Sequence, residues 1–504
     1  MSKDEIRVQY SGFIVFSAQI LSVVTGIVFT LLLTRNMTKQ QYGIWSNIFD
    51  LMGYFTILSG LLPFWATRFV ARGKEGVIKT GLFANLVLAT ASTAVYLSLI
   101  SLVTGAFNIG GAYVILYLVA SLQIINIYMI SILEGCLRAV KPQVIGYGLL
   151  IEEVCKVSLA CILIVGLHQL FLGAMLSIIV AASIQALYYI RLLAKGLRQR
   201  IQRNYLNEWL KGSTAIFYNA VGNQLVAFIF ILLFLYGGQA ARGEYQAAAT
   251  FSNIVGYSSF LAFALYPKLL AKNSLEDVAS SFKTVLMFAI PMGTITITMP
   301  QSLLTILKVD YSSVSSVLIL LTLDTFVLLI SQFYSSLLLG VERLDEEGKI
   351  SLNKLVRSKI FKVFTLPYIQ AAIALPTAYY VLTHLVSNDS VQAVLYVTTI
   401  NICVHTATFL GMYAIMRKSV RMAVAWRSIG KYLFAAAATA AVLLLLPQPT
   451  TILLTLGKVA GGLATYAVLL LAIDAEAREL VALIWREIKG IFGGFGKREL
   501  TQVR

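Results

Sequence analysis

Residues 11–34 read SGFIVFSAQILSVVTGIVFTLLLT and contain no charged side chain. A helix of about 20 mostly apolar residues is long enough to cross the hydrocarbon layer of a membrane. The preceding segment, Met1 to Tyr10, is polar, and no small-residue cleavage site follows the apolar stretch. The stretch therefore predicts a first transmembrane helix that is retained in the mature protein.

The rest of the chain has the same character. Of its 504 residues, 58% are hydrophobic and only 12% are charged. A soluble domain carries about a quarter charged residues, and a disordered chain is poorer still in apolar residues. Both classes are excluded. The composition predicts an all-α, polytopic membrane protein with about 14 transmembrane helices.

Fourteen apolar stretches are long enough to be candidate spans, although one is short and Pro291 interrupts another. They are residues 11–34, 42–66, 80–104, 112–133, 144–167, 170–193, 213–236, 246–270, 282–299, 314–339, 361–385, 391–416, 431–446 and 452–473.

The positive charges test this assignment. The chain has 40 Lys and Arg against 23 Asp and Glu. With the N-terminus inside, 34 of the 40 lie on the inner side, two lie within spans (Lys156 and Lys458), and four face the opposite side. Those four are Arg35, Lys39, Arg242 and Lys308. Because basic residues gather on the cytoplasmic side of membrane proteins, we expect a multi-pass protein of the cell membrane with both termini cytoplasmic. The excess charge is thus expected to meet lipid headgroups rather than nucleic acid.

The two halves of the chain resemble each other. Tyr42, Gly53 and Tyr54 recur 203 residues later as Tyr245, Gly256 and Tyr257. A shift of six helices preserves orientation, so we expect two pseudo-symmetric six-helix lobes related by an axis along the membrane normal. The predicted organisation is an N-terminal lobe (1–193), a basic cytoplasmic linker (194–212), a C-terminal lobe (213–416), two additional transmembrane helices (417–473) and a cytoplasmic tail (474–504) with an amphipathic helix from Ala475 to Phe492.

Residues 33–45, LTRNMTKQQYGIW, resemble the first loop of the polysaccharide transporters, in which an Arg, a polar turn and a Tyr-Gly pair lead into the second helix. The Gly135-x-x-Arg138 ending of the fourth span and the arrangement of six, six and two helices are also similar. This family is a branch of the multidrug/oligosaccharidyl-lipid/polysaccharide exporter superfamily. The resemblance implies a flippase that moves a polyprenyl-phosphate-linked oligosaccharide between leaflets.

Several basic residues are candidate ligands for the phosphate of such a substrate. Lys156 and its repeat partner Lys362 would form a basic pair above the inner opening, because a phosphate group needs charged partners in a low-dielectric site. Glu152 lies one turn from Lys156, so a self-neutralised pair without a ligand is the alternative. Residues at the inner mouth, which are more often topology anchors, complete the set: Arg68, Lys268, Lys272, Arg138 and Arg343.

Polar and acidic residues at membrane depth are the other candidates, since such groups are costly unless they face water or a partner. For a sugar-binding, cavity-lining surface they are Asn47, Asp50, Asn219, Asn223, Gln224 and Asn253, with contacts between helices as the alternative. For coupling to H⁺ or Na⁺ they are Asp324, Glu152, Glu153 and His405. For Asp324 the alternative is a hydrogen bond to the hydroxyl of Thr322 or Thr325.

No motif for chemistry is present in the sequence. It contains no Walker A motif and no HExxH or Cys/His cluster, and its four cysteines have no metal-ligand spacing. We expect a transporter rather than an enzyme, without cofactor or metal. Its expected partners are the lipid-linked oligosaccharide, membrane lipids and a coupling cation.

Three functions remain open. A flippase predicts a chamber that is positive at its inner end, whereas a cation-coupled small-molecule exporter predicts an acidic one around Asp50 and Asp324. A non-transporting scaffold for glycosyltransferases predicts no continuous polar chamber.

Overall fold

The computed structural model describes residues 3–262, 275–341, 359–387, 389–419, 425–449, 451–479 and 481–482, and within these ranges it is helical without strands. The first half contains α1 (Lys3–Asn36), α2 (Lys39–Phe55), η1 (Ile57–Gly60), α3 (Leu61–Ala71), α4 (Val77–Ala106), α5 (Gly111–Val140), α6 (Gln143–Ala160), η2 (Cys161–Gly166), α7 (Leu170–Leu192), α8 (Ala194–Leu197) and α9 (Arg203–Gly212). The second half contains α10 (Thr214–Leu232), η3 (Leu233–Gly237), α11 (Gln239–Gly256), η4 (Tyr257–Ala262), α13 (Leu275–Thr298), α14 (Pro300–Leu307), η5 (Val309–Val314), α15 (Ser315–Val341), α17 (Lys359–His384), α18 (Ser390–Ser419), α19 (Trp426–Leu445) and α20 (Ile452–Ile473).

The predicted class, an all-α polytopic membrane fold, is confirmed. Within the described ranges, nine helices are long and apolar enough to cross a membrane, and the bent pair α2–α3 makes a tenth. Over the described residues, every predicted span coincides with a helix or with a helix and its neighbouring short helical turns; residues 263–270 of the eighth span lie outside those residues. The count of fourteen crossings stays a prediction.

Two spans differ from the sequence pattern. The second is broken, because α2 and the segment from Ile57 to Ala71 meet at 55° across a short turn. The ninth is not interrupted: α13 continues through Pro291, and the chain breaks only before Pro300, which begins α14. A proline removes one backbone hydrogen bond from a helix, but neighbouring helices make this tolerable in a membrane bundle.

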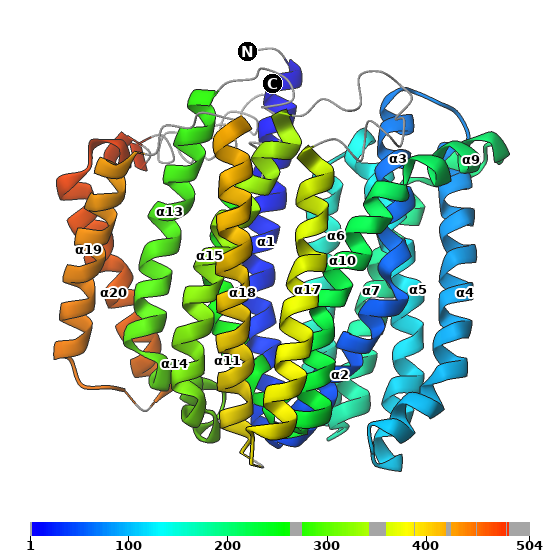
Figure 1. Cartoon of the computed structure of the whole chain (residues 1–504). Coiled ribbons are helices and arrows are strands. Elements are labelled where there is room, and N and C mark those ends of the chain that lie inside the picture. Colours follow the sequence, from blue (N-terminus) through cyan, green and yellow to red (C-terminus); the bar gives the residue numbers. More distant parts are fainter. Residues whose placement is uncertain are drawn as a thin grey trace, which may run out of the picture.

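The helices form two groups with α19 and α20 at one side (Figure 1). The helices α1–α7 pack with one another and are called the first lobe, and α10–α18 are called the second lobe. Helix α1 begins and α20 ends at the same face of the molecule, here called the proximal face (Figure 1). The opposite face, where α1 ends and α2 begins, is called the distal face. The charge asymmetry of the sequence predicts that the proximal face is cytoplasmic.

The apolar core shows how the lobes meet. In the distal half, one continuous cluster of buried residues runs through both lobes, from Phe29 of α1 to Val404 of α18. In the proximal half the core is divided: one cluster, around Phe69 and Trp209, belongs to the first lobe with α9, and another, around Phe282 and Phe333, belongs to the second lobe with α19 and α20. Among the described residues, the lobes therefore share one core distally and have separate cores proximally.

The linker between the lobes is docked onto the first lobe. Trp209 of α9 is fully buried, and its ring lies 5.6 Å from that of Phe69 and 6.1 Å from that of Tyr205. Ser213, at the end of this helix, donates to the carbonyl of Leu61. The linker helix α9 is thus packed on the first lobe, in part through α3.

Candidate functional site

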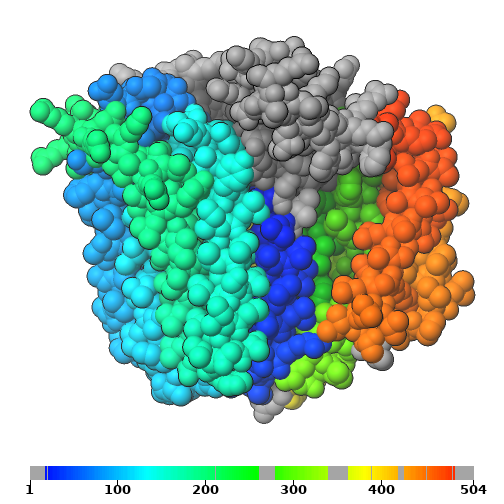
Figure 2. Space-filling model, turned by 180° about the vertical axis from the view of Figure 1, so that it is seen from behind, coloured from blue at the N-terminus to red at the C-terminus, as the bar shows by residue number. Residues whose placement is uncertain are grey.

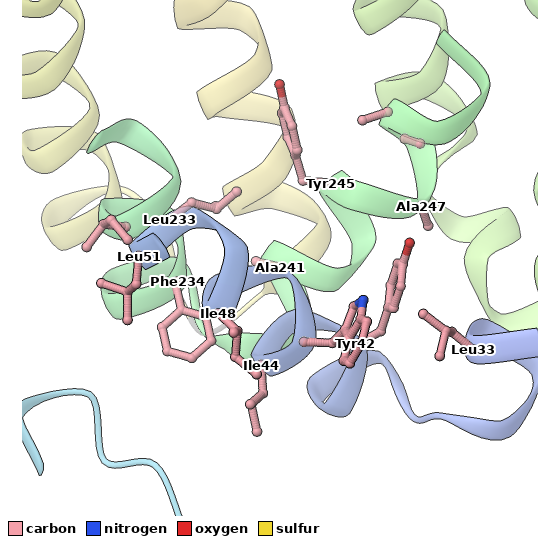
Figure 3. Packing of buried hydrophobic residues seen from close by; sticks show 14 of the residues in the cluster. Leu33, Tyr42, Ile44, Ile48, Leu51, Leu233, Phe234, Ala241, Tyr245 and Ala247 are labelled. Atoms are coloured by element: carbon pink, nitrogen blue, oxygen red, sulfur yellow. The ribbon is translucent and has the colours of Figure 1, made fainter. Parts of the chain in front are cut away.

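Helices α2 and α11 cross at the centre of the distal contact, and glycines make the crossing possible. A Cβ atom on Gly43 would lie 1.8 Å from the carbonyl oxygen of Gln239, and one on Gly243 would lie 2.2 Å from that of Lys39. Both separations are far inside van der Waals contact, so only glycine fits at either position. Figure 3 shows the apolar packing beside this crossing, with Tyr42, Ile44 and Ile48 of α2 close to Ala241 of α11.

Two ion pairs join the lobes at this crossing. Arg242 of α11 donates from Nε to Asp50 Oδ2 at 2.6 Å and from a terminal nitrogen to Oδ1 at 2.9 Å. Lys39 of α2 donates to Glu244 at 2.6 Å. Arg242 and Glu244 are buried, so both pairs are strengthened by the low local dielectric. We call these two ion pairs the distal latch.

The remaining two basic residues predicted for the far side also bridge the lobes. Arg35 of α1 donates to the carbonyl of Ile306 in α14, and Lys308 donates to that of Met37. All four of these basic residues therefore contact the opposite lobe. The predicted minority of far-side charges is used to close the distal face.

Amide side chains are exposed on two second-lobe helices that pack against α2. Asn223 of α10 and Asn253 of α11 are exposed, and the apolar side chains that α10 exposes, among them Leu225 and Phe228, lie on the opposite side of that helix. Leu225 is suited to lipid and Asn223 to water, whereas the ring of Phe228 packs edge-on against that of Tyr54 of α2, at 6.3 Å between centroids. Gln224 instead meets α2, where its carbonyl accepts from Tyr54.

Two predicted cavity residues lie elsewhere. Asn47 is completely buried, and its side-chain oxygen accepts from Tyr117 at 2.8 Å, so it joins helices of the first lobe. Asp50 is engaged by Arg242. Asn219, which is half-buried, accepts through its carbonyl from Asn223, one turn further along α10.

The charged turn of α6 is occupied by its own partners. Lys156 donates to Glu153 at 2.7 Å, and the predicted pairing with Glu152 is replaced by this three-residue spacing. The buried Glu153 also accepts from Ser22 at 2.9 Å and from Thr25 at 2.5 Å. Glu153 thus fastens α1 to α6, and Lys156 neutralises it.

The other predicted phosphate ligands are at the proximal ends of helices. Lys362 of α17 and Arg138 of α5 are exposed, while Arg68 of α3 is half-buried with its guanidinium 4.0 Å from the ring of Phe64. Lys268, Lys272 and Arg343 lie outside the described residues, as does most of the predicted helix from Ala475 to Phe492.

The second lobe contains a buried acid–imidazole pair. Asp324 of α15 accepts from or donates to His405 Nδ1 of α18 at 2.8 Å, and both side chains are largely buried. The hydroxyls of Thr322 and Thr325, the alternative partners, both donate to carbonyls of their own helix instead. The sequence identified both members of this pair but not their contact.

A groove lies between α19 and α20. It encloses about 470 Å³ and is lined mainly by apolar residues, including Leu443, Leu446 and Leu454, and by Gly457 and Gly461. At its distal end Lys458 donates to the carbonyls of Leu446 and Pro447, which terminate α19.

Arg242 and Glu244 were not identified from the sequence as site residues. The internal repeat contained a signal for Arg242, because the shift of 203 residues that relates Tyr42 to Tyr245 also relates Lys39 to Arg242. Their acidic partners do not obey the same shift.

No protein-family model and no curated protein matches the sequence. Solved transporters share its fold. The lipid II flippase MurJ in an inward closed conformation is 14% identical, with a TM-score of 0.61 over 92% of this chain and 99% of that one. A multidrug resistance MATE family transporter of the MOP superfamily, in an outward-facing conformation, is 13% identical, with a TM-score of 0.57 over 81% of this chain and 94% of that one. A MOP superfamily transporter from Pyrococcus furiosus is 14% identical, with a TM-score of 0.53 over 82% of this chain and 95% of that one. The chain therefore has the fold of the multidrug/oligosaccharidyl-lipid/polysaccharide exporter (MOP) superfamily of membrane transporters.

Proposed function

We propose that this protein is a flippase that moves a polyprenyl-(pyro)phosphate-linked oligosaccharide across the cell membrane by alternating access. The observation that carries the proposal is the presence of two unlike surfaces: exposed amides on α10 and α11, the second-lobe helices that pack against α2, and an apolar groove between α19 and α20. A lipid-linked sugar has a polar and an apolar part, and it needs both surfaces at once.

Exposed amides support a polar chamber between the lobes that opens toward the proximal face. Asparagine is costly against lipid, so Asn223 and Asn253 are placed best beside water or a hydroxyl-rich ligand. The lobes are joined distally and have separate proximal cores, which is the geometry of a carrier open on one side. Sugar hydroxyls would hydrogen-bond these amides.

The groove between α19 and α20 supports the binding of a long apolar tail. It lies outside the two lobes, and a structural match that covers 92% of this chain is the flippase MurJ. A soluble drug needs no such lateral groove. We propose that the polyprenyl chain lies there while the headgroup crosses between the lobes.

We assign the phosphate to cations at the proximal ends of helices, exposed Lys362 and Arg138 and half-buried Arg68, rather than to Lys156. Lys156 is held by Glu153 with Glu152 beside it in sequence, so an added phosphate would meet carboxylates. Lys362 is exposed, and Arg68 and Arg138 lie at the same end of the helices. These three would attract the phosphate at the proximal mouth.

The groove offers a direct test. The protein is reconstituted in liposomes with a fluorescent polyprenyl-pyrophosphate glycan, and translocation is followed by membrane-impermeant quenching. Gly461→Leu fills the groove without a steric clash, because nothing lies within 4 Å of a Cβ at this position. We expect a large loss of translocation. Gly430→Leu, on α19 outside the groove and equally uncrowded, is the matched control and is expected to retain it.

The same liposomes separate the alternatives. Translocation of the glycan that is unaffected by Gly461→Leu would contradict the assigned groove. Extrusion of a soluble organic cation without any glycan translocation would contradict the flippase and favour the exporter. Transport of neither substrate would favour the scaffold.

A second test addresses the phosphate. We expect Lys362→Ala to raise the glycan concentration needed for half-maximal transport several-fold, because an exposed charged contact contributes up to about 1 kcal/mol. Lys156→Ala is expected to lower protein stability instead, because it leaves Glu153 buried and unpaired. The opposite result for the two variants would return the phosphate to Lys156.

A further inference from the structure

Lys458 is a cation in the distal part of a membrane-spanning helix. It lies six residues after the start of α20, about 9 Å along the helix axis, and its side chain is half-buried. Its ammonium group donates to the carbonyls of Leu446 at 3.0 Å and Pro447 at 3.3 Å, which satisfies two acceptors at the end of α19. A charge at this depth is costly unless it meets a partner, so it is a candidate functional group.

No carboxylate neutralises this charge in the described part of the chain. Helices α14, α19 and α20 and residues 446–451 contain no Asp or Glu, and the described lining of the groove includes none. The two carbonyls need hydrogen-bond donors but not a charge. A lysine has three N–H donors, and among the described residues only these two carbonyls accept from Lys458. Its third N–H and its positive charge are therefore open to a ligand.

The other basic residues away from the proximal face have partners of their own. The charge count of the sequence places six Lys and Arg there. Four of them bridge the lobes, and Lys156 is neutralised by Glu153. Lys458 is the sixth, and within the described residues it contacts neither a carboxylate nor the opposite lobe. It is thus the member of this set that is best placed to receive an anion.

Lys458 lies at the distal rim of the groove between α19 and α20, close to the seam between the lobes. The rim is held to the second lobe, because Gln448 accepts from Ser302 of α14 at 3.0 Å. Helix α14 in turn packs on both α1 and α20. It therefore connects the seam beside α1 to the rim of the groove, on the side where the C-terminal helices lie (Figure 2).

We propose that Lys458 binds the phosphate of the lipid carrier on the distal side, after the headgroup has crossed the membrane. This inference rests on the proposed function. The phosphate is covalently joined to the polyprenyl chain, so a chain in the groove places the phosphate at the groove's rim. There the ammonium and the phosphate form a charge-assisted hydrogen bond at low dielectric. Lys362 attracts the phosphate at the proximal mouth, and Lys458 holds it at the opposite end before release.

Prenyl probes test this site without any transport. The full-length protein in phosphatidylcholine nanodiscs is photolabelled with geranylgeranyl diphosphate or geranylgeraniol, each with a diazirine at the chain end. Labelling of α19 and α20 peptides is quantified by mass spectrometry against probe concentration. The chains are identical, so the ratio of the two half-saturation concentrations reports on the phosphate. We expect the diphosphate to saturate at a concentration several-fold lower than the alcohol.

Variants identify the group that reads the phosphate. Lys458→Gln keeps an amide donor for the two carbonyls but removes the charge, so we expect both probes to saturate at the same concentration. Lys458→Arg is expected to retain the preference. Lys308→Gln, which removes a distal cation outside the groove, is the matched control and should retain it too. Gly461→Leu fills the groove and is expected to abolish labelling by both probes.

Three results would overturn the inference. One is an undiminished preference for the diphosphate in Lys458→Gln. Another is weaker labelling of Lys458→Gln by both probes together with a lower unfolding temperature, which would show that the lysine only caps α19. The third is displacement of the diphosphate probe by phosphatidylglycerol as effectively as by unlabelled geranylgeranyl diphosphate, which would assign the site to an anionic lipid of the bilayer.

Failure of this inference and failure of the proposed function give different results. Glycan translocation in liposomes by a protein that labels equally with both probes would refute the phosphate site and leave the flippase intact. A preference for the diphosphate that depends on Lys458, in a protein that translocates no glycan, would support the site and refute the proposed function.

Discussion

Arg242 has the largest consequence of any single side chain for how the lobes meet. It is buried, it makes two hydrogen bonds to Asp50 across the lobe boundary, and its remaining terminal nitrogen donates to Gln246. Breaking one partner of a buried pair leaves an uncompensated charge, at a cost of about 3–5 kcal/mol. We therefore expect Asp50→Ala to open the distal face and to lower thermal stability. The double reversal Asp50→Arg with Arg242→Asp should recover part of both, and a double-mutant cycle measures the coupling. Additive effects of the single changes would show that the pair does not couple the lobes.

Glu153 has a comparable role within the first lobe. It gathers Ser22 and Thr25 of α1 and Lys156 of α6 around one carboxylate. We expect Ser22→Ala with Thr25→Ala to destabilise the protein by about 1–3 kcal/mol, because Glu153 keeps its charge and loses two donors. Hydrogen exchange of α1 amides in detergent, compared with Ser98→Ala on the exposed side of α4, checks whether α1 is loosened selectively. Unchanged exchange of α1 would contradict this role.

Residue types at the site were predictable from the sequence, but their partners were not. Asp324 and His405 stand out as ionisable groups in apolar stretches. Which acid pairs with Lys156 depends on how α1 lies against α6, because Ser22 and Thr25 turn Glu153 into the site that Lys156 neutralises. The identity of Asp50's partner depends on the packing of helices 192 residues apart. Local spacing allows either Glu152 or Glu153 to pair with Lys156, and it contains no information on the contact between Asp50 and Arg242.

At the scale of the helices, the crossing of α2 and α11 limits how closely the two lobes can approach each other. We expect Gly43→Val to prevent closure, because its side chain would overlap the backbone of Gln239, and backbone cannot move aside at low cost. Longer distances between spin labels at Asn108 and Ser387, exposed residues of distal loops in the first and second lobes, would be the signature in a variant with its four native cysteines replaced. Gly26→Val on α1, which meets no atom within 4 Å, is the matched control and should leave the distances unchanged. Closure that persists in Gly43→Val would show that the glycine is dispensable.

The sequence predicted where helices lie better than it predicted where they break. Apolar length predicts that a segment spans the membrane, and each predicted span is helical over the residues that the structure describes. It does not predict that α2 and α3 meet at 55°, because no proline lies at the break and the turn is set by contacts with α4, α5 and α10. At Pro291 the sequence predicts a break that the structure does not have, since α13 continues through this residue.

At the scale of the whole molecule, the distribution of the core predicts how the lobes move. The distal cluster crosses the lobe boundary, whereas each proximal cluster belongs to one lobe. We expect hydrogen exchange in the distal parts of α2 and α11 to accelerate when the latch is broken by Arg242→Gln, while Trp209 and its neighbours in the first lobe keep their protection. Equal acceleration in both regions would show global destabilisation instead of a lobe movement.

The overall architecture followed from the sequence because apolar length and charge asymmetry are properties of whole segments, which the bilayer constrains directly. The lobe organisation, in contrast, was suggested by a weak repeat. The arrangement of α2 and α11 offers a structural parallel, since each helix is followed by a short 3₁₀ turn at a similar place, Ile57–Gly60 and Tyr257–Ala262. The duplication itself stays a prediction.

Helix α1 stands at the seam between the lobes, with the first lobe on one side and the second lobe and the C-terminal helices on the other (Figure 2). Hydroxyl contacts fasten its middle to α6, and Arg35 fastens its distal end to α14. An amphiphile whose tail never leaves the bilayer would have to pass beside this helix to bring its headgroup inward. The composition and thickness of the surrounding membrane would then set how readily cargo is admitted, so the speed of an otherwise identical protein is expected to vary with the lipids in which it is embedded.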